Sequence, residues 1–221
     1  MLELLRNFRR RPDREAALRS YRRLHGGYDH SARWIEGIRA QAVELLALRE
    51  GDTVLDVACG TGALLPVLSR AVGASGHVIG IEQSPEMAAL ARRRAAGAPW
   101  ANVSLVVAPL EDASIGAHAD AVLFCYTHDV LQSDLAIENV MRHARVGARV
   151  VVAGARVLGW WAAPLNLWKL WRSRHYLSTY AGLRDPTARL RRHCPDLRIV
   201  ATRILGTSYL AAGHAGNGRV L

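Results

Sequence analysis

Residues 54–62, with the sequence VLDVACGTG, constrain the fold of this chain more than any other stretch. An apolar run that contains one acid, Asp56, ends there at Gly60 and Gly62. Such a run is typical of a buried parallel strand, and the glycines allow a tight turn where a ligand can approach the backbone. The next residues, 63–72, predict a helix with Pro66 in its first turn. Strand, glycine turn and helix form a nucleotide-binding unit.

Strands and helices alternate over the next hundred residues. The pattern predicts strands at residues 53–57, 77–82, 103–107, 120–126 and 147–153, and helices at 31–48, 63–72, 85–96 and 130–144. Two further strands, 197–204 and 207–212, are expected to form an antiparallel hairpin that closes the sheet. This order predicts an open, mostly parallel α/β sheet.

Ligands of such sheets bind beyond the carboxyl ends of the strands. The polar or glycine residues at those ends are Gly60, Glu82, Glu111 or Asp112, and Tyr126 with His128. Although they are far apart in the sequence, we expect them to face one crevice.

The glycine pattern discriminates between nucleotides. The dinucleotide fingerprint needs a third glycine at position 65, which is a leucine here, and no Gly-Lys-Ser/Thr follows. Asp56, inside the strand, would repel a pyrophosphate but suits an ammonium group. Glu82, at the next strand end, suits a ribose diol. These conditions point to a ligand with adenine, ribose and an amino-acid tail but no phosphate, which is S-adenosylmethionine.

The run VLDVACGTG, with Glu82 ending the next strand, resembles the class I S-adenosylmethionine (SAM)-dependent methyltransferases over residues 28–155. Within them it is similar to small-molecule and lipid-type enzymes, such as those of quinone biosynthesis and phosphatidylethanolamine N-methylation. The resemblance implies a Rossmann-like, seven-stranded, mostly parallel sheet with helices on both faces and an antiparallel C-terminal strand.

The resemblance also implies a cofactor site. Asp56 would bind the amino group, Gly60 and Gly62 would line the methionine and ribose, and Glu82 would bind the ribose hydroxyls. The family pattern Gly-Asp-Ala after the third strand is Ala108-Pro109-Leu110 here, so the acid for adenine is either Glu111 or Asp112. The full expected set is Tyr28, Asp56, Ala58, Gly60, Thr61, Gly62, Glu82, Gln83, Leu110, Glu111, Asp112 and Tyr126.

Methyl transfer from a sulfonium is an in-line displacement, so a base is needed only if the acceptor must lose a proton. His128 is the candidate base, and the alternative is a histidine with a local hydrogen-bonding or positioning role. Tyr28 is a second catalytic candidate. The expected acceptor-binding residues are His25, His128, Trp160, Trp161, Trp168, Tyr176 and Tyr180.

Four of the six tryptophans fall between residues 160 and 171, beside Arg172 and Arg174. Such a segment can cover an apolar acceptor or sit at a lipid interface, or it can pack into the core or a dimer interface. We therefore expect a small, apolar or lipid-like acceptor and, with it, peripheral membrane contact. The oligomeric state stays open.

Composition excludes several other classes. The net charge of +10 comes almost wholly from arginine. Aromatic residues are not interleaved with the basic residues, which argues against nucleic acid as a partner. The separated cysteines Cys59, Cys125 and Cys194 argue against a disulfide framework or a zinc site, so we predict no metal and a cytoplasmic protein.

We expect a single domain, with a helical cap (1–48), a cofactor core (49–155), an acceptor-covering insertion (156–195) and a hairpin (196–213). Within the cap, Arg11-Pro12-Asp13 divides residues 1–25 into two helical pieces, with Asp13 as the N-cap of the second. Two other functions compete with methyl transfer: an NAD(P)-dependent oxidoreductase, and a non-catalytic SAM-binding or membrane-associated protein. Two features weigh against the oxidoreductase: position 65 is a leucine rather than a glycine, and the sequence has no Tyr-x-x-x-Lys pair.

Overall fold

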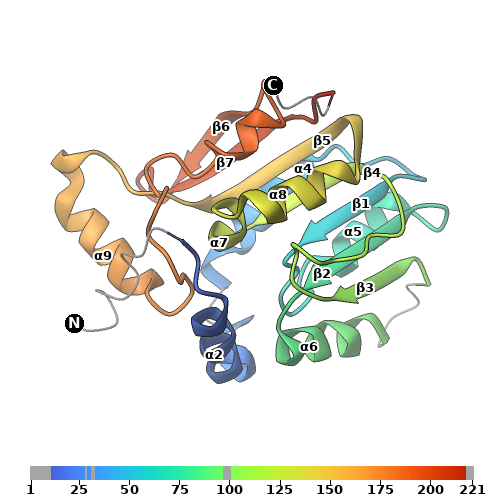
Figure 1. Ribbon diagram of the computed structural model, residues 1–221, viewed down its shortest axis with the longest axis horizontal. Coiled ribbons are helices and arrows are strands. Elements are labelled where there is room, and N and C mark those ends of the chain that lie inside the picture. Colours follow the sequence, from blue (N-terminus) through green and yellow to red (C-terminus); the bar gives the residue numbers. More distant parts are fainter. Residues whose placement is uncertain (1–10, 28, 31–32, 97–100, 218–221) are drawn as a thin grey trace.

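Seven strands form one sheet in a computed structural model that describes residues 11–27, 29–30, 33–96 and 101–217. Their order across the sheet is β3–β2–β1–β4–β5–β7–β6 (Figure 1). The strands are β1 (Thr53–Val57), β2 (His77–Glu82), β3 (Val103–Val107), β4 (Ala119–Cys125), β5 (Ala144–Ala155), β6 (Arg198–Arg203) and β7 (Ser208–His214). β1 to β5 pair in parallel, and only β7 runs antiparallel to its neighbours β5 and β6. The predicted mostly parallel sheet with an antiparallel C-terminal strand is confirmed.

Helices cover both faces of this sheet. The helices α4 (Glu36–Leu45), α5 (Leu65–Val72) and α6 (Pro85–Ala96) pack on one face, and α8 (Asp134–Arg142) packs on the other (Figure 1). Successive residues of a strand point to opposite faces, so Val54 joins the core under α4 and α5 while Leu55 joins the core under α8. Both faces are therefore apolar, as the continuous apolar strands require.

The prediction of one helix over residues 130–144 was wrong. The structure has α7 (His128–Leu131), a break at Gln132, and then α8, while β5 already begins at Ala144. The side chain of Ser133 causes the break, because its Oγ accepts the N–H of Ala136 at 3.3 Å and caps the new helix. The helix expected at 63–72 starts at Leu65 with Pro66 in its first turn, as predicted.

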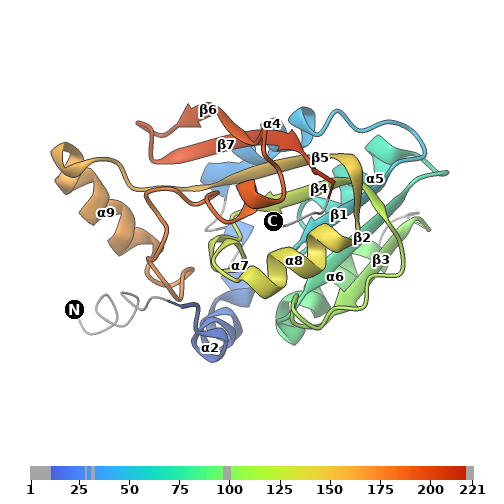
Figure 2. The ribbon, with the colours of Figure 1, turned by 45° about the horizontal axis from the view of Figure 1, so that its top comes forward.

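The segments outside the sheet are α2 (Arg14–Leu24), η1 (His25–Gly27), η2 (Arg33–Ile35), η3 (Trp160–Ala162), α9 (Ala163–Ser173) and η4 (Leu190–Arg192). In Figures 1 and 2, α9 stands away from the sheet at one end of the molecule. The expected capping role of Asp13 is confirmed, since its Oδ1 accepts the N–H of Ala16 at 3.0 Å. The helix expected before residue 11 lies outside the described residues.

Asn139 holds the loop that follows β3 at the carboxyl end of the sheet. Its buried Nδ2 donates to the carbonyls of Leu110 at 2.8 Å and Ala113 at 2.9 Å, so it fixes the loop that follows β3. We predict that Asn139→Ala lowers the free energy of unfolding by roughly 1–3 kcal/mol, because it leaves buried carbonyls without donors. Urea unfolding measures this loss. The exposed neighbour Glu138→Ala is the matched control, and an equal loss in both variants would contradict the bracing role.

Candidate active site

Glu82 fixes the geometry at the centre of the site. It is the last residue of β2, and its Oε2 accepts the N–H of Gly60 at 2.9 Å while its Oε1 accepts the N–H of Ser84 at 2.7 Å. Burial raises the pKa of this carboxyl, and the backbone N–H donors act in the opposite direction. Each oxygen has a lone pair left beyond its backbone bond, so a rigid acceptor of two further protons lies beside the glycine loop.

Gly60 and Gly62 have different surroundings, although both adopt positive φ angles of 59° and 73°. A Cβ on Gly60 would point into open space, with no atom within 4 Å. A Cβ on Gly62 would lie 2.7 Å from Leu65 Cδ1 and 3.0 Å from the Cβ of Ala91, where α5 and α6 meet. Gly60 therefore borders ligand space, whereas Gly62 permits close packing of the two helices.

Asp56 and Arg39 lie together at one end of the site. A small cavity of about 30 Å³ is lined by Arg39, Asp56, Gly60 and Thr61. Asp56 Oδ2 is buried and has no hydrogen-bond partner among the described residues. Burial raises the pKa of Asp56 to about 7, although the nearby Arg39 guanidinium opposes the shift. This end thus presents one cation and one acid whose Oδ2 receives no hydrogen bond from the described part of the chain.

Thr61 is held by residues from two distant segments. Its Oγ1 donates to Asp29 at 2.6 Å, and Arg94 of α6 pairs with Asp29 at 2.6 Å and donates to the Thr61 carbonyl at 2.5 Å. Burial tends to raise the pKa of Asp29, but the hydrogen bonds from Thr61 and Arg94 outweigh it, so the pKa is lowered. This network fixes the outer side of the glycine loop.

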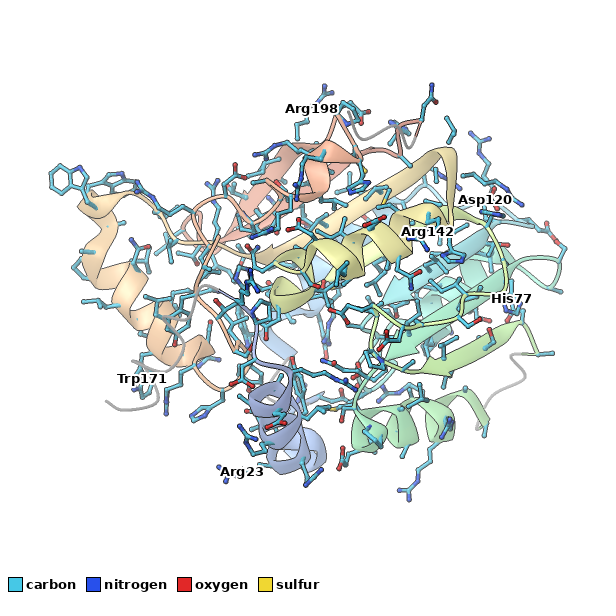
Figure 3. All side chains as sticks on the ribbon, in the orientation of Figure 1. Arg23, His77, Asp120, Arg142, Trp171 and Arg198 are labelled. Atoms are coloured by element: carbon cyan, nitrogen blue, oxygen red, sulfur yellow. The ribbon has the colours of Figure 1, made fainter. Side chains whose placement is uncertain are left out.

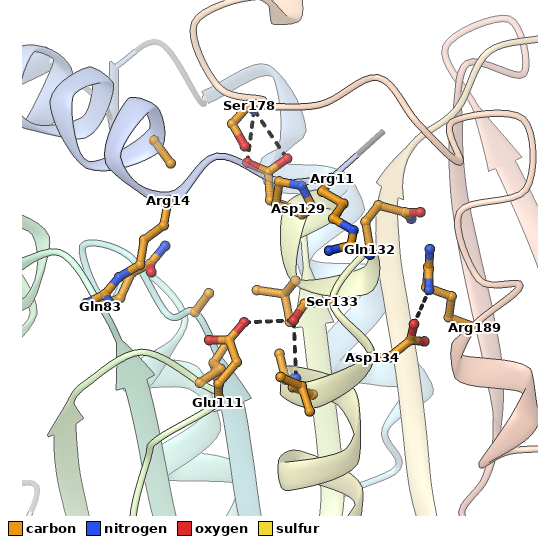
Figure 4. A pocket seen from close by; sticks show the side chains of 17 residues that line it. Arg11, Arg14, Gln83, Glu111, Asp129, Gln132, Ser133, Asp134, Ser178 and Arg189 are labelled. Atoms are coloured by element: carbon orange, nitrogen blue, oxygen red, sulfur yellow. Dashed lines mark hydrogen bonds and ion pairs between the residues drawn. The ribbon is translucent and has the colours of Figure 1, made fainter. Parts of the chain in front are cut away.

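A larger cavity of about 430 Å³ lies at the other end of the site (Figure 4). Its walls include Ala58, Gln83, Leu110 and Glu111, which were predicted to bind the cofactor. Ser133 Oγ donates to Glu111 Oε1 at 2.7 Å and orients this carboxylate. Asp112 does not line the cavity, so Glu111 is the better placed of the two acids considered for adenine.

A space of about 60 Å³ joins the two ends and is bordered by Gly60, Glu82, Tyr126 and His128. Tyr126, at the end of β4, has a positive φ of 59°, and its hydroxyl donates to Ser208 Oγ at 3.4 Å. Its ring meets Trp34 edge to face at a centroid distance of 6.3 Å. Tyr126 thus borders the space, and its side chain also contacts β7 and Trp34.

Comparisons with known proteins identify methyltransferases that are similar in sequence. Residues 54–147 match a family described as the methyltransferase domain. The sequence is 34% identical over 113 residues to a protein-L-isoaspartate O-methyltransferase of Methanothrix thermoacetophila, covering 51% of this chain and 52% of that one. It is 31% identical over 126 residues to a demethylmenaquinone methyltransferase of Shouchella clausii, covering 54% and 49%. This chain therefore spans about half the length of these curated relatives.

The fold is likewise similar to that of a SAM-dependent methyltransferase from Aquifex aeolicus, with a TM-score of 0.55, 19% identity and coverage of 80% of this chain and 88% of that one. Residues 54–147 thus match a methyltransferase domain, and the sheet around them has the Rossmann-like fold of SAM-dependent methyltransferases.

The described residues fit the cofactor of that class. Gly60 borders open space, Glu82 holds two oxygens ready for hydroxyl donors, and Asp56 carries a buried oxygen without a donor. An adenosyl amino acid offers a diol and an ammonium group, which are the donors that these acids lack.

Arg39 is the site residue that sequence reasoning missed. It lies on α4, which was recognised only by its apolar spacing, and it is one of many arginines. No local pattern distinguishes it, because its nearness to Asp56 arises only when α4 packs on the sheet. Its guanidinium suits a carboxylate.

His128 borders the site, as the sequence predicts, but its side chain is buried. Its Nε2 is 2.9 Å from the carbonyl of Ala181, which makes Nε2 the protonated nitrogen, and its buried Nδ1 has no partner among the described residues. Burial lowers the pKa of His128 to about 4, even though the Ala181 bond favours the charged form. The ring is therefore neutral, and its Nδ1 is a buried acceptor without a donor among the described residues.

Asp129 neither orients His128 nor caps α7. Its carboxylate accepts the N–H of Ser178 at 2.9 Å (Figure 4). Ser178 Oγ in turn accepts the N–H of Asp13 at 2.9 Å. Two segments far apart in the sequence, around residues 13 and 178, are thereby attached to α7.

The tryptophan-rich segment is exposed. The exposed fractions are 87% for Trp160, 70% for Trp161, 45% for Trp168 and 54% for Trp171, whereas Tyr180 is buried and donates to the Leu170 carbonyl at 3.2 Å. Among the aromatic residues predicted to bind the methyl acceptor, Tyr176 borders the space of about 60 Å³ between the two ends of the site. His25 begins η1, and Tyr28 lies outside the described residues.

The two glycines give separable effects. We predict that Gly60→Ala lowers the affinity for S-adenosylhomocysteine by more than about tenfold, because its Cβ enters ligand space, with a stability loss of only about 1–2 kcal/mol for the positive φ. Gly62→Ala should cost roughly 2–4 kcal/mol of stability, because its Cβ also collides with Leu65 and Ala91. Calorimetric titration and urea unfolding measure the two quantities. A larger stability loss in Gly60→Ala would refute this division of roles.

The pKa of Asp56 predicts pH-dependent binding. If its carboxylate pairs with the ligand ammonium, the protonated form that dominates below its pKa of about 7 must lose a proton on binding. Affinity for S-adenosylhomocysteine should therefore fall about tenfold from pH 8 to pH 6. Titrations in buffers of different ionisation enthalpy should also record proton release at pH 6. Asp56→Asn should bind more weakly and without this slope, and an unchanged slope in that variant would exclude Asp56 as its source.

Proposed function

We propose that the protein transfers a methyl group from SAM to a small acceptor. The observation that carries the proposal is the pair of buried acids beside Gly60: Glu82, fixed by two backbone N–H groups, and Asp56, whose Oδ2 lacks a donor. Their positions suit the ribose and the amino group of one ligand. The comparisons do not favour the oxidoreductase alternative, since the relatives named above are methyltransferases.

In this proposal each end of the site binds one part of the cofactor. Asp56 and Arg39 bind the ammonium and carboxylate of the amino-acid end, with Thr61 beside them, and Glu82 accepts the ribose hydroxyl protons. Gln83, Leu110, Glu111 and Ala58 surround the adenine. The cofactor supplies an activated methyl group on a sulfonium. The protein's contribution is to hold the acceptor in line with it, and such positioning can supply up to roughly 7–11 kcal/mol.

His128 acts in this proposal as a hydrogen-bond acceptor that positions the substrate. A pKa of about 4 keeps its ring neutral at physiological pH but makes Nδ1 a weak base. This favours an acceptor that needs little help in losing its proton, or one that donates a hydrogen bond to Nδ1.

The acceptor is small and apolar or lipid-like. The exposed tryptophans beside Arg172 and Arg174 support this, and so does a relative named for demethylmenaquinone. A relative named for protein L-isoaspartate shows that a similar core also serves other acceptors.

Peripheral membrane contact through α9 and η3 belongs to the proposal, as do a cytoplasmic location and the division into cap, core, insertion and hairpin. Among the described residues, no helix is long and apolar enough to cross a bilayer.

The test is transfer of a tritiated methyl group from SAM into fractionated metabolites and lipids, together with titrations of SAM, S-adenosylhomocysteine and NADPH. We expect the two adenosyl amino acids to bind, NADPH to fail, and the label to enter an apolar fraction. Binding of NADPH alone would overturn the proposal. Binding of SAM with no transfer into any fraction would favour a non-catalytic protein.

Ribose recognition has its own prediction. Glu82→Gln keeps the shape of the side chain but removes its negative charge. Its amide nitrogen is a donor at a position where the ribose needs a second hydrogen-bond acceptor. The affinity for S-adenosylhomocysteine should fall by about 1.5–3 kcal/mol, the value of a hydrogen bond to a charged group. Glu138→Gln, which changes an exposed acid of α8, is the control. Equal affinities in the wild type and Glu82→Gln would remove Glu82 from the site.

A further inference from the structure

A further cavity, of about 590 Å³, lies between α2 and residues 174–178. Its two walls are joined by hydrogen bonds, from Ser20 Oγ to the His175 carbonyl at 2.5 Å and from the Tyr21 hydroxyl to the Tyr176 carbonyl at 3.4 Å. Ala17, Tyr21 and Tyr176 border both this cavity and the space next to Glu82 and His128. The cavity therefore adjoins the place where the methyl group would be presented.

The walls of this cavity are basic. Arg23 comes from α2, and Arg174 and His175 come from the opposite wall, whereas Arg19 of α2 already pairs with Glu15 at 3.3 Å. Among the described lining residues the only acid is Asp13, and its Oδ1 already accepts the N–H of Ala16. Arginine side chains suit carboxylate and phosphate oxygens, so the charge favours an anionic group.

An apolar surface continues from the same rim. The Arg174 guanidinium lies 4.5 Å from the centre of the Trp171 ring, and the exposed Trp168 and Leu167 follow on α9. Figure 3 shows the labelled side chains of Arg23 and Trp171 at the same end of the molecule. Indole rings occupy boundaries that are apolar on one side and wet on the other. Cations inside the cavity and aromatic rings outside it match a molecule that has a charged head and an apolar body.

We propose that this cavity binds the anionic group of an amphiphilic acceptor, a phosphate or a carboxylate, while the Trp168 and Trp171 surface of α9 contacts its apolar part. This inference rests on the proposed methyltransferase function and specifies its substrate class. The occupant is a single amphiphile rather than a bilayer.

The experiment is calorimetric titration of the full chain, saturated with S-adenosylhomocysteine, with dodecyl phosphate below its micelle concentration. Dodecylphosphocholine, inorganic phosphate and phosphatidylglycerol vesicles are the comparison ligands. We expect one dodecyl phosphate per chain, bound about tenfold more tightly than dodecylphosphocholine, which has no net charge, and than inorganic phosphate, which has no apolar part. Binding to the vesicles alone, or equal binding of the two dodecyl compounds, would overturn the proposal.

Variants locate the site. Arg23→Gln and Arg174→Gln should each weaken dodecyl phosphate binding by about fivefold or more. Trp171→Ala should weaken dodecyl phosphate but leave inorganic phosphate unchanged. Arg198→Gln is the matched control, because Arg198 is an exposed arginine of β6 at the opposite side of the molecule (Figure 3). An equal loss in Arg198→Gln would show unspecific charge attraction and contradict the proposal.

The first step of each titration distinguishes a failure of the proposed function from a failure of the basic-cavity assignment. If wild-type protein fails to bind S-adenosylhomocysteine, the proposed function fails. If it binds S-adenosylhomocysteine and shows no preference for dodecyl phosphate, the assignment of the basic cavity alone is wrong.

Discussion

The structure of the site depends on one buried carboxylate. Glu82 is tied through backbone N–H groups to Gly60 in the loop after β1 and to Ser84 at the start of α6. An anion in a dry setting is costly unless donors surround it, and here two of the donors belong to the main chain. The glycine loop and the entry to α6 are thus fixed relative to each other, and the remaining lone pairs of Glu82 point to where hydroxyl donors of a ligand would complete its environment.

The two sides of the site are built differently. The cofactor side comes from the ends of adjacent parallel strands, which the sheet places together. The proposed acceptor side comes from α2 and residues 174–180, which are attached to the rest of the site through Asp129, Ser178 and Asp13 and through the Arg22–Glu86 ion pair at 2.9 Å. A further attachment holds α9, where Lys169 and Arg172 lie 4.8 and 5.2 Å from the centre of the Trp34 ring. Burial lowers the pKa of Lys169 to about 8, so this contact is a charged group in a largely dry setting.

The residues that sequence reasoning found are those with a local signature. Glu82 and Gly60 stand at fixed places relative to apolar strands, so the parallel sheet and its crevice followed from the order of the elements. Gly62 was assigned to the cofactor, yet its neighbours are Leu65 and Ala91 on two packed helices. Its role depends on how closely α5 and α6 approach, which no spacing records. Arg39 and the Ser133 cap were missed for a related reason, since one acts across a helix–sheet interface and the other is a single residue within a helical pattern.

The most direct test of this cofactor site is a crystal structure of the protein with S-adenosylhomocysteine. We expect both ribose hydroxyls to lie within hydrogen-bond distance of the Glu82 carboxylate. We also expect the amino group at Asp56, the carboxylate at Arg39, and the adenine between Gln83 and Leu110. A ligand bound with its ribose away from Glu82, or with its amino-acid end away from Asp56, would contradict the assignment of this site to an adenosyl amino acid.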